Sequence, residues 1–256
     1  DERKKLSHLN LIASKKAIKL SSFESAAKYA GRGIDYLDDN AWDKEDYMLP
    51  LQLHSTAAKA EGFLGNLNAT EQYCKTVIAN DRIPLDHKLE FYAIWVEGMS
   101  SSSRVAEAIP LIFEVLSKYG CGFPKTRALV KADIMTNMFW LKTRIKLRDP
   151  CKLPTLNDDT RVELMKLLDH LSIFLYILND SRLSLVIFRS LMWTLKYGIS
   201  QHSAPSFANT GLILTGVHNE FQSGEAFGQH ALSILKNTQS SSTAARTIFL
   251  VHTYLF

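Results

Sequence analysis

A pattern that occurs three times in the first half of the chain constrains the fold most. In each case a helical segment with small residues on its inner face is followed by a tight turn and a second helical segment. The second segments open on large apolar residues, Phe23, Leu67 and Val105, which are separated by 44 and then 38 positions. Small side chains let two antiparallel helices approach closely, and such hairpins bury their remaining apolar faces by stacking on neighbours. The sequence therefore predicts an all-α chain of stacked helix hairpins.

Helical periodicity extends through the rest of the chain. Leu6, Leu9, Ala13, Ala17 and Leu20 recur at three- and four-residue steps, as one buried helix face requires. Clusters of turn-forming residues interrupt the periodic segments and predict around a dozen helices. The clusters are Ser21–Ser22, Asp38–Asn40, Gly65–Asn66, Ser100–Ser103, Gly120–Pro124, Asp149–Pro150, Asn179–Asp180, Gly198–Ser200 and Ser240–Ser242.

The predicted fold class is an all-α solenoid of antiparallel, tetratricopeptide-like hairpins. A tetratricopeptide repeat has a period of about 34 residues, so the longer spacing here implies longer connections. We expect one continuous helical array, in which residues 1–123 form three hairpins and residues 124–182 form connecting helices with a Leu-Pro loop at Leu153-Pro154. Residues 183–256 form further hairpins. We also expect a fragment truncated at its C-terminal end, since the chain lacks an initiator Met and stops within the apolar run Thr247–Phe256.

Composition and charge narrow the class of protein. Apolar residues make up 46% of the chain and charged residues 22%, as in a globular protein. The net charge of +4 is spread along helix faces without a dense basic stripe, which argues against a nucleic-acid partner. The most apolar segment, Leu171–Leu178, is far shorter than the roughly 20 residues of a membrane span, so we expect a soluble protein with no membrane partner.

The three cysteines indicate the compartment. Cys74, Cys121 and Cys151 have no paired spacing and are odd in number, which favours reduced, idle thiols over a disulfide framework. We therefore expect a cytoplasmic protein.

Several segments carry a resemblance to a known family. They are Leu191–Gly198, Gly211–Val217, Ser223–Gly228 with Ala231-Leu232 and, earlier, Ala13–Ala17, Leu51–Gly65, Ala108–Pro124 and Leu153–Asp158. Together they resemble the helical region that follows the AAA-type NTPase module in large multidomain signalling kinases. In that family a serine/threonine-kinase-like domain precedes the NTPase, and a GAF sensor with a histidine kinase or cyclase often follows the helical region. The resemblance implies a regulatory arm that has no catalytic residues of its own.

Signatures of catalysis, cofactor binding and metal binding are missing from the sequence. The chain contains no GxxxxGK[ST], GxSxG or HExxH, and Gly120-Cys121-Gly122 reads as a helix end rather than a nucleotide loop. The histidines are spread singly, without the one-turn spacing of a metal pair. They are His8, His54, His87, His170, His202, His218, His230 and His252. We therefore predict no catalytic, cofactor or metal residues and no enzyme.

Four other features have a functional and a structural interpretation, and we favour the structural one for each. Asp158-Asp159 reads as a helix N-cap, and the Cys121 thiol as inert. The Gly224 and Gly228 pair reads as close helix packing rather than a membrane dimer motif. Three tryptophans read as core residues: Trp95, Trp140 and Trp193.

One set of residues points to binding. In a tetratricopeptide stack the first helix of each hairpin lines a groove, where Lys15 and Lys59 occupy equivalent places and Lys19 lies one turn beyond Lys15. Ammonium groups there would attract an acidic peptide or a carboxylate. The alternative is an ordinary solvated helix face.

The sequence thus predicts a non-catalytic scaffold of a signal-transduction protein, with other proteins or neighbouring domains as partners. Two alternatives stay open: an RNA- or peptide-binding helical repeat, and an all-α enzyme of the terpene-cyclase type. The enzyme would need a DDxxD cluster, which Asp38–Asp43 approaches with the wrong spacing.

Overall fold

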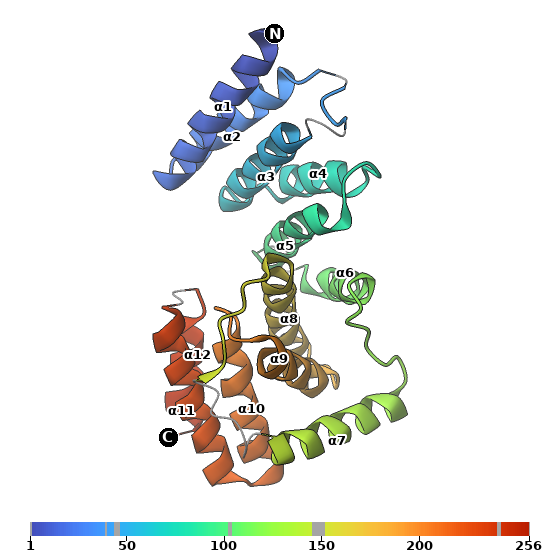
Figure 1. Ribbon diagram of the computed structural model, residues 1–256, viewed down its shortest axis with the longest axis vertical. Coiled ribbons are helices and arrows are strands. Elements are labelled where there is room, and N and C mark those ends of the chain that lie inside the picture. The colour runs from blue at the N-terminus through green and yellow to red at the C-terminus, as the bar shows by residue number, and fades with distance from the viewer. Residues whose placement is uncertain are drawn as a thin grey trace. The chain divides into compact units, whose positions relative to one another are not determined.

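The computed structural model describes residues 2–38, 40–43, 47–101, 104–144, 152–239 and 242–255, with the side chains of all of these except 142–144. Within these ranges it contains twelve α-helices, and extended pairing is confined to a single bridge between Thr155 and Ile199. The all-α prediction is confirmed (Figure 1). Among the predicted sites and turns, Asp39, Ser102–Ser103, Asp149–Pro150, Ser240, Ser241 and Cys151 lie outside the described residues.

The chain divides into two compact units, residues 1–111 and residues 112–256. Unit 1 holds α1 (Glu2–Lys19), α2 (Phe23–Asp35), α3 (Met48–Phe63), α4 (Leu67–Ile78), α5 (Leu85–Ser101) and the start of α6 (Val105–Lys118). Unit 2 holds the end of α6, α7 (Arg127–Arg144), α8 (Asp159–Ile177), α9 (Leu183–Tyr197), α10 (Ser203–His218), α11 (Phe221–Thr238) and α12 (Ala244–Tyr254). The predicted division at residues 123 and 182 stays a prediction.

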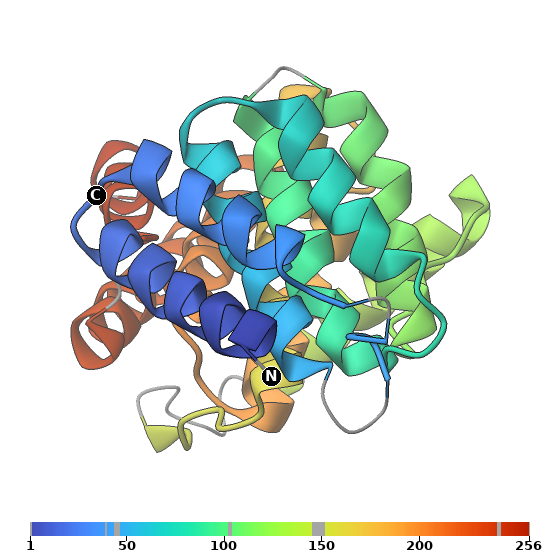
Figure 2. The same ribbon diagram turned by 90° about the horizontal axis from the view of Figure 1, so that it is seen from above.

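In unit 1 the helices pack in a regular order. The helix α1 packs against α2 and α3, α3 packs against α4 and α5, and α2 and α4 each also pack against the helix that follows them. The pairing of α1 with α2 is visible in both views (Figures 1 and 2). The second helices begin at Phe23, Leu67 and Val105, as the repeated pattern predicted.

One motif ends four helices, and each instance coincides with a predicted turn cluster. After α1, α3, α6 and α8 one residue has positive φ, and the next residue donates its N–H back to a carbonyl five residues earlier. After α6, for example, Gly120 has φ +75° and the Cys121 N–H donates to the Leu116 carbonyl at 2.8 Å. This is the Schellman arrangement, which satisfies carbonyls that the helix end leaves unpaired. The interpretation of Gly120 as a helix cap is confirmed.

Unit 2 is built around α9 and α10. The helix α9 packs against α7, α8 and α10, and α10 also packs against α11 and α12. Its core contains large buried side chains from these helices, among them Phe188, Leu191, Phe207 and Phe227. Gly224 lies where a β-carbon would come within 3.0 Å of the Gly211 carbonyl oxygen, and Gly228 faces Val251 and Leu255. The interpretation of Gly224 and Gly228 as close helix packing is confirmed.

The core assignment of Trp140 was wrong. Trp140 is 45% exposed. The helix α7 packs on α9 through the side that carries Met138 and Leu141, and Trp140 does not lie on that side. Trp95 and Trp193 are partly buried, in keeping with the prediction. Over the described part of the chain, none of the helices combines the length and the apolar character that crossing a membrane requires.

Candidate functional site

A row of polar side chains connects the first helices of successive hairpins in unit 1. The Lys15 Nζ of α1 donates to the Gln52 Oε1 of α3 at 2.8 Å. The Ser55 Oγ and Lys59 Nζ of α3 both donate to the Glu90 Oε1 of α5, at 2.9 and 2.5 Å. We call these five residues the inter-helix polar row. The row brings Lys15 and Lys59 onto one continuous surface formed by three helices.

The lysines of this surface differ in their electrostatics. Lys59 forms an ion pair with Glu90, so its charge is balanced locally. Both side chains are more than two-fifths exposed, and such a pair contributes little stability in water. Lys15 donates to a neutral amide and keeps its full charge, and Lys19 is exposed in the last turn of α1. The positive end of the row therefore lies on α1.

Beside Lys59 there is a hollow of about 340 Å³ between α3 and α5. Its lining comprises Lys59, Gly62, Phe63, Ile94, Glu97, Gly98 and Ser101. The Phe63 ring is stacked on Phe23 of α2, with centroids 4.4 Å apart, yet the residue is 64% exposed. This volume is at the lower end of what small-ligand pockets offer. An apolar side chain of a bound segment could enter it, with the polar row alongside.

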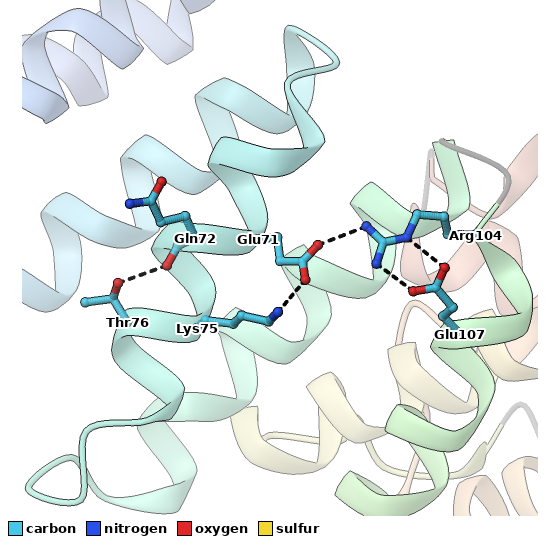
Figure 3. Close-up of polar contacts among 6 residues, drawn as sticks. All are labelled: Glu71, Gln72, Lys75, Thr76, Arg104 and Glu107. Atoms are coloured by element: carbon cyan, nitrogen blue, oxygen red, sulfur yellow. Dashed lines mark hydrogen bonds and ion pairs between the residues drawn. The ribbon is translucent and has the colours of Figure 1, made fainter.

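A second polar network in unit 1 joins α4 to the start of α6 (Figure 3). Arg104 donates to Glu71 at 2.9 Å and to Glu107 at 2.6 and 3.0 Å, and the Lys75 Nζ lies 2.6 Å from Glu71. The hydrogen bond from Lys75, together with Arg104, lowers the pKa of the Glu71 carboxyl. Sequence reasoning missed this network, because Glu71 and Arg104 are 33 residues apart and only the Arg104–Glu107 spacing is a local signal.

The same figure shows a bond within α4, from the Thr76 Oγ1 to the Gln72 carbonyl oxygen at 2.9 Å. The two cations and two carboxylates of the network balance one another, and the Arg104–Glu71 pair ties the residue before α6 to α4. We assign it a structural role.

Unit 2 contains a buried polar cluster that the sequence did not reveal. Arg246 of α12 donates to Asp169 of α8 at 2.5 Å, and the Thr243 Oγ1 donates to the Gln201 carbonyl oxygen at 3.1 Å. Next to Gln201, His202 is 6% exposed, and burial lowers the pKa of its imidazole to about 4. His202 is therefore neutral at pH 7. The cluster fastens the start of α12 to α8 and to the turn before α10.

The predicted N-cap role of Asp158 is confirmed, and the inert role of Cys121 stays a prediction. The Asp158 carboxylate accepts the Arg161 backbone N–H at 3.0 Å and caps α8. Burial raises the pKa of the Cys121 thiol even though the Arg189 guanidinium lies 3.6 Å from its Sγ, so the thiol stays protonated. Burial also raises the pKa of Cys74, to about 12.

The described residues include no group of three or more His, Cys, Asp or Glu side chains placed to share a metal ion. Comparison with known protein families, with characterised proteins and with solved structures found no match for the chain.

Proposed function

We propose that this chain is a helical-repeat interaction module, a tetratricopeptide-like solenoid that binds an acidic peptide segment along the first helices of its hairpins. The observation that carries the proposal is the inter-helix polar row with its adjoining hollow. Together they offer an apolar recess, hydrogen-bonding groups and an unbalanced positive charge on Lys15 along one surface. These are the components that recognise an extended peptide.

The packing order of unit 1 supports the solenoid assignment. The first helices α1 and α3 each pack on the second helix of their own hairpin and on the first helix of the next hairpin, and the second helices α2 and α4 each pack on the helix that follows. A stack of helical repeats needs these nearest-neighbour contacts, because a single hairpin cannot bury both of its faces.

A protein segment is favoured over an RNA strand by the small amount of unbalanced positive charge on this surface. Glu90 neutralises Lys59, which leaves too few cations along the polar row for a phosphate backbone that carries a negative charge at every nucleotide. A peptide can place an apolar side chain in the hollow and a carboxylate near Lys15. In this proposal the chain has no catalysis of its own and serves as the regulatory arm of a larger signalling protein, as the family resemblance implies.

The proposal is tested by selecting short unstructured peptides from a displayed library against the full chain. We expect enriched sequences to combine an apolar residue with acidic residues. We expect Lys15→Glu to lower their affinity at least about tenfold, a change of about 1.4 kcal/mol. Lys28→Glu, on the exposed side of α2, is the matched control and should leave affinity unchanged. Failure to enrich acidic peptides, or equal binding by both variants, would refute the proposal.

A further inference from the structure

The outer face of α1 carries apolar residues in the open. Leu9 and Ile12 lie one turn apart and are 61% and 60% exposed. Lys5 lies four residues before Leu9 and Lys16 four residues after Ile12, and both lysines are exposed on the same stripe of the helix. Isolated exposed apolar residues are common, but a pair at helical spacing bracketed by cations forms a patterned face.

The same positions are covered in the next two hairpins. The second helices of the three hairpins start at Phe23, Leu67 and Val105, which are 44 and then 38 residues apart. The same offsets align Leu9 with Leu53 of α3 and Phe91 of α5, and both of these residues are 0% exposed. They align Ile12 with Thr56 and Ile94, which are 4% and 5% exposed. Leu53 packs with Leu11 and Ile34 of the preceding hairpin, and Phe91 packs with Ala58 and Val77 of the preceding hairpin. In this fold, therefore, the face is one that a preceding pair of helices covers.

Lys5 and Lys16 determine which charges a helix that covers α1 should carry. The residues of α3 equivalent to Lys5 and Lys16 are Leu49 and Ala60, which are both buried and apolar. A helix that docks on α1 as α1 and α2 dock on α3 would meet two ammonium groups where α3 offers apolar contacts. Carboxylates at those two places would balance the ammonium groups, and apolar residues between them would cover Leu9 and Ile12.

Two other occupants fit less well. A second copy of the chain packing α1 against α1 in antiparallel fashion would bring Lys5 of one copy near Lys16 of the other, and these like charges would repel. Binding to a membrane surface requires a helix with a broad apolar face and favours aromatic residues at the edge of that face. The stripe on α1 has only two aliphatic residues between lysines. The equivalent faces of α3 and α5 are shaped to hold helices.

We propose that the outer face of α1 is a second docking surface, which binds an amphipathic helix of a partner protein whose acidic residues bracket an apolar pair. The surface shares no residue with the polar row, and its proposal does not depend on the proposed function. It depends only on the hairpin packing of unit 1.

The test is selection of helical peptides from a display library with one randomised face, again against the full chain. We expect the selected helices to carry Glu or Asp about one turn on either side of apolar residues. We expect Leu9→Asp with Ile12→Asp, and separately Lys5→Glu with Lys16→Glu, to weaken their binding at least about tenfold. All four positions are exposed, so these variants should keep the circular dichroism spectrum of the parent chain.

Matched controls separate this face from other surfaces. Val217→Asp with Phe221→Asp alters exposed apolar residues of unit 2 and should leave binding unchanged, as should Lys59→Gln, which alters the polar row on α3. The proposal is overturned if no acidic helices are enriched, or if the selected helices bind the α1 variants as well as the parent. Tighter binding of the parent chain to phosphatidylserine vesicles than to the selected helices, lost in the same variants, would also overturn it.

Discussion

Arg246 and Asp169 lie 77 residues apart in sequence, yet the Arg246 Nη2 donates to the Asp169 Oδ1 at 2.5 Å and ties α12 to α8. Both side chains are mostly buried, at 28% and 12% exposed. Burial makes this pair sensitive to the loss of one partner, because the remaining charge keeps its desolvation cost without its counterion.

Replacing one member of the pair should therefore loosen α12. We expect Arg246→Met to destabilise the attachment of α12 by roughly 1–2 kcal/mol, which is less than for a fully buried pair because water reaches part of the site. The readout is hydrogen–deuterium exchange of the α12 amides, which should become faster while exchange in α3 is unchanged. The double variant Arg246→Met with Asp169→Asn should recover part of the protection, and equal exchange in all three proteins would contradict the assignment.

The buried His202 makes the stability of unit 2 depend on pH. Burial is the largest cause of the low pKa of His202, ahead of the opposing attraction of Asp169, and Lys166, His170 and Arg246 lower it further. Since the folded pKa of about 4 lies below the unfolded value of 6.5, the unfolded chain takes up the proton first as the pH falls. The neutral imidazole thus favours the folded state above pH 6.5, and this stability declines between pH 6.5 and pH 4.

We expect a loss of about 2 kcal/mol in the free energy of unfolding of unit 2 between pH 7 and pH 5 from this group. Urea titrations at the two pH values, followed by hydrogen exchange of α10 and α12, measure it. His202→Gln should have a smaller difference between the two pH values than the parent chain. An unchanged difference in this variant would show that His202 is not the responsible group.

Two glycines of α2 should respond in opposite directions to alanine. A β-carbon at Gly33 would lie 2.5 Å from the Leu53 Cδ2 and 3.2 Å from the Asn10 Cβ, so three helices meet there. We expect Gly33→Ala to destabilise unit 1 by about 1–3 kcal/mol, because Leu53 is fully buried and has little room to move. At Gly31 the nearest atom is the Tyr73 hydroxyl at 3.9 Å. Gly31→Ala should therefore stabilise the helix by up to about 1 kcal/mol. Urea unfolding of both variants decides, and equal effects would contradict the packing described for α1, α2 and α3.

The two lysines of the polar row should contribute unequally to peptide binding. Lys15 keeps its charge, whereas the charge of Lys59 is balanced by Glu90. We expect Lys15→Gln to weaken binding of an acidic peptide severalfold and Lys59→Gln to change it by less than about twofold. Fluorescence anisotropy with one selected peptide at low and at high salt provides the comparison. A larger effect of Lys59→Gln would show that the ion pair opens on binding.

The local features of this fold could be read from the sequence, and the long-range ones could not. Phe23, Leu67 and Val105 begin helices and Gly120 caps one, because turn chemistry and apolar spacing act over a few residues. The buried state of His202 depends on α8 and α12, which are distant in sequence and leave no mark near residue 202. For Trp140 the local pattern was misleading. The residue belongs to an apolar helical stripe, which predicted burial, yet it lies on the exposed side of α7.

Only part of the candidate binding surface could be predicted from the sequence. Equivalent places in the repeated pattern predicted that Lys15 and Lys59 line one groove. The structure shows Lys15 bonded to Gln52 of α3 and Lys59 bonded to Glu90 of α5, and their role in binding stays a prediction. The pairing of Lys59 with Glu90 spans 31 residues and requires α3 and α5 to be neighbours, so no local pattern signals it. The hollow next to Phe63 likewise depends on how α3 and α5 pack.

The most direct measurement is the map of backbone amide chemical-shift changes when the isotope-labelled full chain binds an unlabelled acidic peptide selected against it. The account predicts that the shifts cluster on α1, α3 and α5, around Lys15, Gln52, Lys59 and the lining of the α3–α5 hollow. Shifts confined to unit 2 or to the α2–α4 side of unit 1, with the polar row unaffected, would contradict it.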